Sequence, residues 1–271
     1  MILQNPLLST LFACIRAPFA VILYEYPLHE RIRTWLRLED LFDKTLFFIR
    51  AKDPRSHHAA LLAIFELVDV TARAEMKTEL IQELERQRSA LDVLRNNPAV
   101  DLSRLEGVLT RINRTLAELY AMTGKIGQHV RDNEWLMIIK GRSGIPGGVC
   151  SFDLPSYHYW LYSPQANRSE DLMQWLSPLM PLKAAVDVVL DLLRKSGQVS
   201  HHQASQGQFQ LMLGGRSAHL VRVSMRDEDQ CAPEVSANKY AINIRFIVLD
   251  KAQKPRTCEE DVPFDLTFCN L

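Results

Sequence analysis

The stretch Ser143-Gly144-Ile145-Pro146-Gly147-Gly148 separates two parts of the sequence whose apolar residues recur with different periods. From Tyr26 to Arg142 the apolar residues recur at steps of three and four, which predicts helices. In the last third of the chain they alternate with polar residues, which predicts strands. The sequence therefore predicts an α+β protein, in which an N-terminal helical bundle domain is joined to a C-terminal antiparallel β-rich domain.

Helical periodicity is clearest before the glycines. One apolar face consists of Leu28, Ile32, Trp35, Leu36, Phe42 and Leu46. The stretch Ala59–Val70 is apolar nearly all round, which predicts a helix at the centre of the bundle. Thr78–Leu94 is amphipathic and ends at Asn96-Asn97-Pro98. Ser103-Arg104-Leu105-Glu106 fits a capping box, in which two side-chain oxygens accept from free backbone N–H groups, and predicts a helix start.

The segment beyond the glycines is mixed before it becomes regular. Cys150–Leu161 is rich in aromatic residues and is expected to hold a short strand and a turn, and Asn167–Ser196 returns to a helical period. Three later sets of apolar residues alternate with polar ones: Val221, Val223 and Met225; Ile242, Ile244 and Phe246; Phe264, Leu266 and Phe268. Strands with one apolar and one polar face are typical of antiparallel sheets.

These patterns predict a domain boundary at the glycine-rich stretch. We expect a helical domain over residues 21–145 and a β-rich domain over residues 146–271, with an inserted helical segment near residues 168–196. The run from Pro6 to Leu23 is mostly apolar, but no basic residue precedes it and Arg16 lies within it. A signal peptide has its basic residues before the apolar run, and a membrane span has none in its middle. The run therefore fits neither, and we expect a cytosolic protein.

Net charge and cysteine content disfavour several classes of protein. The 271-residue chain has 32 Lys+Arg and 32 Asp+Glu, so its formal net charge is zero. Proteins that bind nucleic acids usually have a basic excess, because contacts with phosphates supply most of the affinity. The cysteines form no C-x-x-C pair, which predicts reduced thiols and argues against a disulfide framework or a zinc site. They are Cys14, Cys150, Cys231, Cys258 and Cys269.

The spacing of the candidate catalytic residues along the sequence argues against an active site. The loop Gly144–Gly148 lacks the Lys-Ser/Thr pair that follows the glycines of a phosphate-binding loop, so we interpret it as a turn. Cys150, Asp153 and His158 lie close together in the sequence, whereas the groups of a thiol catalytic site usually come from distant segments. We expect Cys150 to be a small buried apolar residue instead. No catalytic residue and no cofactor are predicted.

Two histidine pairs, His57-His58 and His201-His202, are the other candidates for chemistry. Neighbouring side chains diverge, and neither pair has a cysteine or an acidic residue at a metal-ligand spacing. We therefore expect these histidines at the solvated surface and predict no metal site.

Basic residues gather on one face of the first long helix. At about 100° per residue, the face opposite the apolar one carries Arg33, Arg37 and Lys44. Asp40 is the acidic residue that joins them, and Arg73 and Lys77 are four residues apart farther along the chain. Two interpretations remain open. The face is either simply solvated, or it binds an acidic peptide, because guanidinium groups pair with carboxylates.

The same segments resemble the ZapD family of cell-division proteins. The resemblance rests on a series of motifs in order along the chain: Tyr26–Glu39, Lys77–Leu80, Ile126–Gln128, Ile145–Pro155, Val188–Arg194 and Ile244–Phe246. The run from Ile145 to Pro155, which includes Ser-Phe-Asp-Leu-Pro, is the most specific. Residues 1–20 have no counterpart in the family pattern, so we expect Val21 to be the true start of the protein.

The resemblance implies a function. It implies a non-enzymatic homodimer without a cofactor that binds the C-terminal tail of the tubulin-like GTPase FtsZ through a basic surface. It also implies that the protein cross-links FtsZ filaments in the cytoplasm, at the mid-cell division ring, and binds neither nucleic acid nor membrane. Carried over position by position, the partner-binding residues are Arg33, Arg37, Arg73, Lys77, Arg131, Lys140, Arg142, His158 and Arg245.

Some positions depart from the family pattern. Ala241 and Asn243 make the last matching strand less basic than expected, and Glu134 places a carboxylate on the expected surface. Two other interpretations remain. The first is a nucleic-acid-binding cytosolic adaptor that uses the same arginines, which the neutral net charge disfavours. The second is an unrecognised enzyme, which would need a pocket with convergent titratable groups.

Overall fold

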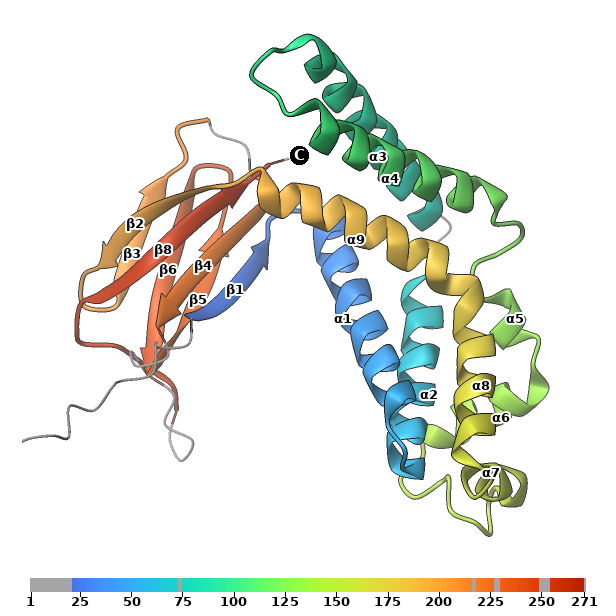
Figure 1. Ribbon diagram of the computed structural model, residues 1–271. Helices are drawn as coiled ribbons and strands as arrows, with labels where there is room; N and C mark the ends of the chain where they lie inside the picture. The colour runs from blue at the N-terminus through green and yellow to red at the C-terminus, as the bar shows by residue number, and fades with distance from the viewer. Residues whose placement is uncertain (1–20, 73–74, 216–217, 227–229, 249–253, 271) are drawn as a thin grey trace, which may run out of the picture. The chain divides into compact units, whose positions relative to one another are not determined.

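The computed structural model describes residues 21–72, 75–215, 218–226, 230–248 and 254–270, and it divides into two compact units (Figure 1). The helical unit is Pro27–Ser196 together with Asn270. The strand unit is Gly197–Cys269 together with the N-terminal segment that ends at Tyr26. Helices precede most of the strands, and the strand pairs with a described register are antiparallel. The α+β prediction is confirmed.

The helices of the helical unit pack around two central helices, α2 and α9. In chain order they are α1 (Glu30–Arg50), α2 (Pro54–Val70), α3 (Met76–Asp92), η1 (Val93–Asn96), α4 (Leu102–Ala121), α5 (Gln128–Arg131), α6 (Glu134–Ser143), α7 (Pro155–Leu161), α8 (Gln165–Leu176), η2 (Ser177–Leu179) and α9 (Met180–Lys195). Helix α2 contacts α1, α6, α7 and α8, which explains why it is apolar on nearly every side. Helix α9 packs against α1, α3 and α4.

Side-chain caps fix where two of these helices begin. The Asp53 side chain accepts from Ser56 N at 2.9 Å, and Pro54 occupies the first turn of α2. The Asp101 carboxylate accepts from Ser103 N and Arg104 N at 3.0 and 3.2 Å, so Asp101 caps α4. The predicted capping box was therefore placed two residues too late. The Asp101 carboxylate has the capping role that was expected of the Ser103 hydroxyl.

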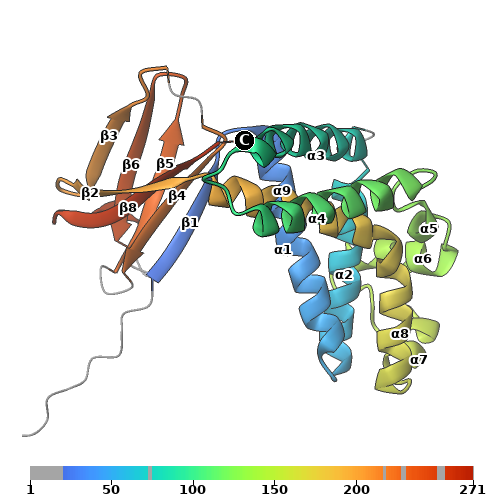
Figure 2. The same cartoon turned by 45° about the horizontal axis from the view of Figure 1, so that its top comes forward.

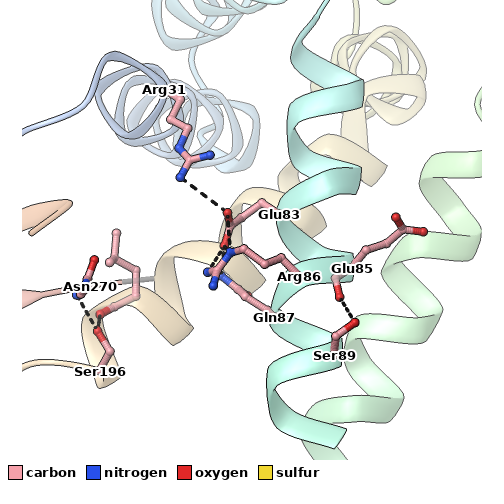
Figure 3. A network of polar contacts seen from close by, with 9 residues as sticks. Arg31, Glu83, Glu85, Arg86, Gln87, Ser89, Ser196 and Asn270 are labelled. Atoms are coloured by element: carbon pink, nitrogen blue, oxygen red, sulfur yellow. Dashed lines mark hydrogen bonds and ion pairs between the residues drawn. The ribbon is translucent and has the colours of Figure 1, made fainter. Parts of the chain in front are cut away.

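A buried carboxylate joins α1 to α3, as Figure 3 shows. Glu83 on α3 is almost fully buried, and its oxygens accept from Arg86 Nη2 at 2.6 Å and from Gln87 Nε2 at 3.1 Å. Arg31 on α1 lies 3.7 Å from the same carboxylate and over the Trp35 ring. A buried carboxylate requires such partners, because desolvation without them is costly. Glu83 and Gln87 are part of the core of the helical unit, and the two arginines lie at its edge.

The strand unit consists of two sheets (Figure 2). Its strands are β1 (Val21–Pro27), β2 (Gln198–Ala204), β3 (Gln208–Met212), β4 (Leu220–Arg226), β5 (Cys231–Ala237), β6 (Ala241–Val248), β7 (Arg256–Thr257) and β8 (Val262–Cys269). One sheet has the order β1-β4-β8-β2, and the other has the order β3-β6-β5 with β7 also paired to β6. Phe264 of the first sheet contacts Phe209 and Phe246 of the second, with ring centroids 5.1 and 5.0 Å apart.

The predicted alternation is confirmed on β4 and β6 and fails at the end of β8. Val223 and Ile244 are buried in their strands, with exposed or half-buried neighbours. On β8, however, Thr267 is buried and Phe268 is half-buried. Gly197 explains why Thr267 is buried. A side chain at position 197 would collide with Thr267, and glycine leaves the space that Thr267 fills.

The compact units do not divide at the predicted boundary of 145/146. Helices α7, α8 and α9 belong to the helical unit, and Cys150–Leu161 forms a turn followed by α7, where a short strand was expected. The reason is an aromatic cluster across the glycine-rich stretch. The Trp135 ring on α6 lies 5.9 Å from the rings of Trp160 and Trp175, which are on α7 and α8.

The N-terminal strand β1 was not predicted. It lies beside β4 at one edge of its sheet, and Glu25 pairs with Arg222 Nε at 3.0 Å.

Residues 1–20 and Arg73 lie outside the described residues. Among the helices that the structure describes, none is both long enough and apolar enough to cross a bilayer.

Candidate partner-binding site

The basic face of α1 is present, and its residues differ in how they are paired. Arg33 Nη1 donates to Glu30 Oε2 at 2.8 Å, and Lys44 Nζ donates to Asp40 Oδ2 at 2.5 Å. The bond to Asp40 raises the pKa of Lys44 and keeps it charged. Arg37 is exposed and has no hydrogen bond or ion pair with any side chain that the structure describes. Arg37 therefore offers all its N–H donors to a partner.

Three of the predicted site residues bind other parts of the helical unit. Arg131 donates from Nη2 to Val68 O at 2.8 Å and from Nη1 to Ile126 O at 2.7 Å. Lys140 pairs with the Asp69 carboxylate, and Lys77 Nζ donates to Met122 O at 2.7 Å. Arg131 and Lys140 thus hold α5 and α6 against the C-terminal end of α2, because Val68 and Asp69 lie there.

His158 lies at the rim of a hollow of about 440 Å³, which we call the α7 hollow. It is lined by Pro54, Arg55, His58, Val149, Tyr157, His158, Leu161 and Tyr162. The rings of His158 and Tyr162 are 4.7 Å apart. Tyr162 is 76% exposed, and the nearby sequence positions Phe152 and Tyr159 are each 80% exposed. Aromatic residues this open to water are typical of protein interaction sites.

The floor of the α7 hollow is uncharged near neutral pH. His58 Nδ1 and the Tyr157 hydroxyl are 2.6 Å apart. Burial lowers the pKa of His58 and raises the pKa of Tyr157, so both side chains favour their neutral forms. Arg55 is exposed at the rim and has no ion pair among the described residues. The hollow therefore combines an uncharged floor with a guanidinium that is available to a carboxylate.

The remaining predicted residues lie apart from the α7 hollow lining. Arg142 Nη1 is 3.9 Å from Asp153 Oδ1, a weak contact to the loop before α7. Arg245 is on β6 in the strand unit, where its Nε donates to Glu234 Oε2 on β5 at 3.1 Å. The predicted residues therefore do not form a single cluster within the helical unit.

Sequence reasoning missed Arg55, Tyr157 and Tyr162. The i, i+4 spacing of His158 and Tyr162 was a usable signal, because residues at that spacing are neighbours on a helix. Nothing in the sequence marks Arg55, which reaches the hollow because α2 begins beside α7.

The structure also corrects the predictions for His57 and Cys150. His57 is buried, where a surface position was expected. Arg168 Nε donates to His57 Nδ1 at 2.9 Å, so Nε2 carries the ring hydrogen and donates to Ala51 O at 2.9 Å. Cys150 is exposed, where a buried position was expected. In the part of the chain that the structure describes, no group of three His, Cys, Asp or Glu side chains is placed to hold a metal ion.

Comparison with known proteins identifies the family. The sequence model of the ZapD family, described as a cell division protein, matches residues 36–245. The chain belongs to the ZapD family of cell division proteins. It is 54% identical to the cell division protein ZapD of Dechloromonas aromatica (strain RCB) over 252 residues, which are 93% of this chain and 100% of the relative.

A second relative gives the same result. The cell division protein ZapD of Aromatoleum aromaticum (strain DSM 19018 / LMG 30748 / EbN1) is 50% identical over 251 residues, which are 93% of this chain and 98% of the relative. The names of these ZapD relatives describe a role in cell division and are not names of enzymes. We therefore assign the chain a role in cell division.

Proposed function

We propose that this ZapD family member is a non-enzymatic factor that binds the C-terminal tail of FtsZ and cross-links FtsZ filaments. In this proposal it acts as a homodimer in the cytoplasm and stabilises the Z-ring at mid-cell. Family membership supports the role in division. The α7 hollow carries the proposal for the docking surface, because it joins an exposed aromatic wall to the free guanidinium of Arg55.

The chemistry of the α7 hollow fits an acidic tail that contains apolar residues. An apolar side chain of the tail fills the space beside Tyr162, and a carboxylate of the tail pairs with Arg55. A disordered tail loses conformational entropy on binding, so one contact of this kind gives modest affinity. A dimer that holds two tails on neighbouring filaments gains avidity from the high effective concentration of the second tail.

The basic face of α1 is a separate contact surface in our proposal, with Arg37 as its available residue and Arg33 as a second contact. The other predicted partner-binding residues are retained as candidates: Arg73, Lys77, Arg131, Lys140, Arg142, His158 and Arg245. Binding of nucleic acid by the same arginines gains no support. Two of these arginines already pair with carboxylates, Arg33 with Glu30 at 2.8 Å and Arg245 with Glu234.

Cosedimentation with FtsZ polymers tests the proposal. With GTP present, the wild-type protein should pellet with FtsZ and produce thick bundles in electron micrographs. FtsZ that lacks its C-terminal tail should recruit none of it. Arg55→Glu should weaken recruitment about tenfold, the effect of losing one charge-assisted contact. Single filaments with the wild-type protein at equimolar concentration would refute the proposed function.

The matched control is Arg104→Glu, which makes the same change at an exposed position on α4. This variant should pellet with FtsZ as the wild type does. If Arg55→Glu and Arg104→Glu bind equally well, the tail docks away from the α7 hollow.

A further inference from the structure

A second hollow lies at the opposite end of α2 from the α7 hollow. It has a volume of about 580 Å³ and is formed by the loop between α4 and α5, the start of α3 and the residues around Pro178 and Pro181. We call it the loop pocket. Val68, near the C-terminal end of α2, lies against the loop, because a Cβ added to Gly127 would be 3.0 Å from its side chain.

The loop pocket is held in shape by contacts from α3, α5 and α8. Lys77 on α3 donates to Met122 O at 2.7 Å, and Arg131 donates to Ile126 O at 2.7 Å. His129 Nε2 and Trp175 O are 2.8 Å apart, which joins the loop to α8. Gly127 has a φ of 71°, a conformation that favours glycine. A pocket that is already formed has less conformational entropy to lose when a ligand binds.

The loop pocket combines positive charge with an apolar wall. Lys77, Lys125 and His129 line it, and the acidic residue in its lining is Glu118, which already accepts from Arg114 Nε at 3.1 Å. Lys125 is exposed and has no hydrogen-bond or ion-pair partner among the described side chains. Lys77 keeps two further N–H donors after it binds Met122 O.

The apolar part of the lining is Met122, Ile126, Pro178 and Pro181. We propose that the loop pocket is a second docking site for an acidic peptide segment. It takes a carboxylate at Lys125 and Lys77 and an apolar side chain against the two prolines. This inference rests on the proposed function, since the peptide is the same partner tail that docks at the α7 hollow.

The spacing of the two hollows suits a single peptide. His58 lines the α7 hollow, and Val68 packs against Gly127, which lines the loop pocket; these two α2 residues are about ten apart, or roughly 15 Å along the helix axis. An extended peptide covers about 3.3 Å per residue, so roughly five residues span this separation. A tail that occupies both sites gains affinity because the second contact forms at high effective concentration.

Substitution of Lys125 tests this second site. Lys125→Glu should weaken cosedimentation with FtsZ polymers about tenfold, because an attraction becomes a repulsion. Lys125→Ala should weaken it about threefold, because only the attraction is lost. Lys195→Glu makes the same change in charge at an exposed lysine at the far end of α9 from Pro181, and should leave binding unchanged. Both Lys125 variants should keep the wild-type melting temperature, whereas Lys195→Glu should lower it slightly, because it replaces the ion pair with Asp191 by a repulsion.

The outcomes separate the two proposals. If Lys125→Glu binds as Lys195→Glu does while Arg55→Glu binds weakly, the loop pocket is not a docking site and the proposed function stands. If the wild-type protein itself does not bind FtsZ polymers, the proposed function fails. In that case, binding of a synthetic acidic peptide by the wild type and not by Lys125→Glu would still support the loop pocket. Absence of that binding would overturn it.

Discussion

Arg168 shows how much of this fold depends on single polar side chains. It is buried on α8, and its guanidinium donates to His57 Nδ1 at 2.9 Å, to Lys52 O at 3.1 Å and to Ser163 O. Lys52 lies between α1 and α2, His57 lies in the first turn of α2, and Ser163 lies just before α8. The buried arginine thus fixes the start of α2, where the α7 hollow is formed.

Loss of the Arg168 guanidinium should therefore destabilise the protein. Arg168→Met keeps the aliphatic stem but leaves buried acceptors without donors, which costs about 1–3 kcal/mol each when they stay dry. We expect the free energy of unfolding to fall by roughly 2–4 kcal/mol in urea titrations followed by circular dichroism. Arg104→Met, at an exposed position, should change it by less than about 0.5 kcal/mol. Equal effects of the two changes would contradict this role.

His58 makes stability depend on pH. Burial lowers its pKa in the folded protein below the ordinary value of 6.5, so the folded state disfavours the proton that the unfolded chain accepts. The sign follows: the stability is present above about pH 6.5 and is lost as the pH falls through the lower, folded pKa. Unfolding titrations between pH 8 and 5 should show a steeper loss for the wild type than for His58→Gln. Identical pH profiles would refute this.

At the scale of the element, the N-terminus of α4 is capped by a different residue from the one that the sequence predicted. Asp101 accepts from two backbone N–H groups, whereas the capping box assigned that role to Ser103. Asp101→Ala should lower the free energy of unfolding by about 1 kcal/mol, the usual effect of losing an N-cap. Ser103→Ala should change it by no more than a few tenths of that amount. Thermal unfolding of both variants checks the assignment, and the reverse order of effects would contradict it.

Helix α1 allows a comparison within one face. Arg33 is already paired with Glu30, and Arg37 has no such partner in the described structure. Arg37→Glu should therefore weaken FtsZ binding by about tenfold, and Arg33→Glu by less, because its pairing with Glu30 must be given up for any contact with the tail. Neither variant should lower the melting temperature by more than a degree or two, as expected of exposed positions. Salt should reduce wild-type binding, since exposed charge pairs are screened.

The elements were largely predictable from the sequence, and their assembly was not. Periodicity is local, so it indicated the helix over Ala59–Val70 and the faces of β4 and β6. The compact units do not divide at 145/146, and the Trp135, Trp160 and Trp175 cluster joins segments that the glycines separate in sequence. Strand β1 was missed because its partner β4 lies at the other end of the chain.

The candidate sites were predicted only in part, because they too are built from segments that are distant in sequence. His158 was named from the family motif, but the α7 hollow also needs Arg55 and His58 from α2, about a hundred residues earlier. No local pattern records that proximity. The loop pocket is likewise built from three separate segments, and of its basic residues Lys77 alone was singled out from the sequence.

At the scale of the whole molecule, cross-linking requires two docking surfaces on one particle, which is why we propose a homodimer. Sedimentation equilibrium should give twice the mass of the chain at micromolar concentration. Dilution to the monomer should abolish bundling before it abolishes binding to single filaments, because avidity is lost first. A monomer that still bundles filaments would contradict the homodimer and would mean that one chain holds two separate tails.

The strand unit is built from both ends of the chain, and this has a consequence for synthesis on the ribosome. Strand β1 emerges early, but its neighbour β4 follows only after the whole of Pro27–Ser196 has been translated. At about 5–20 residues per second, β1 waits roughly 10–40 s as an exposed apolar strand while the helical unit folds. Nascent chains that stall before β4 therefore expose the apolar segment β1. We expect chaperones that bind nascent chains to bind this segment until the C-terminal strands have been synthesised.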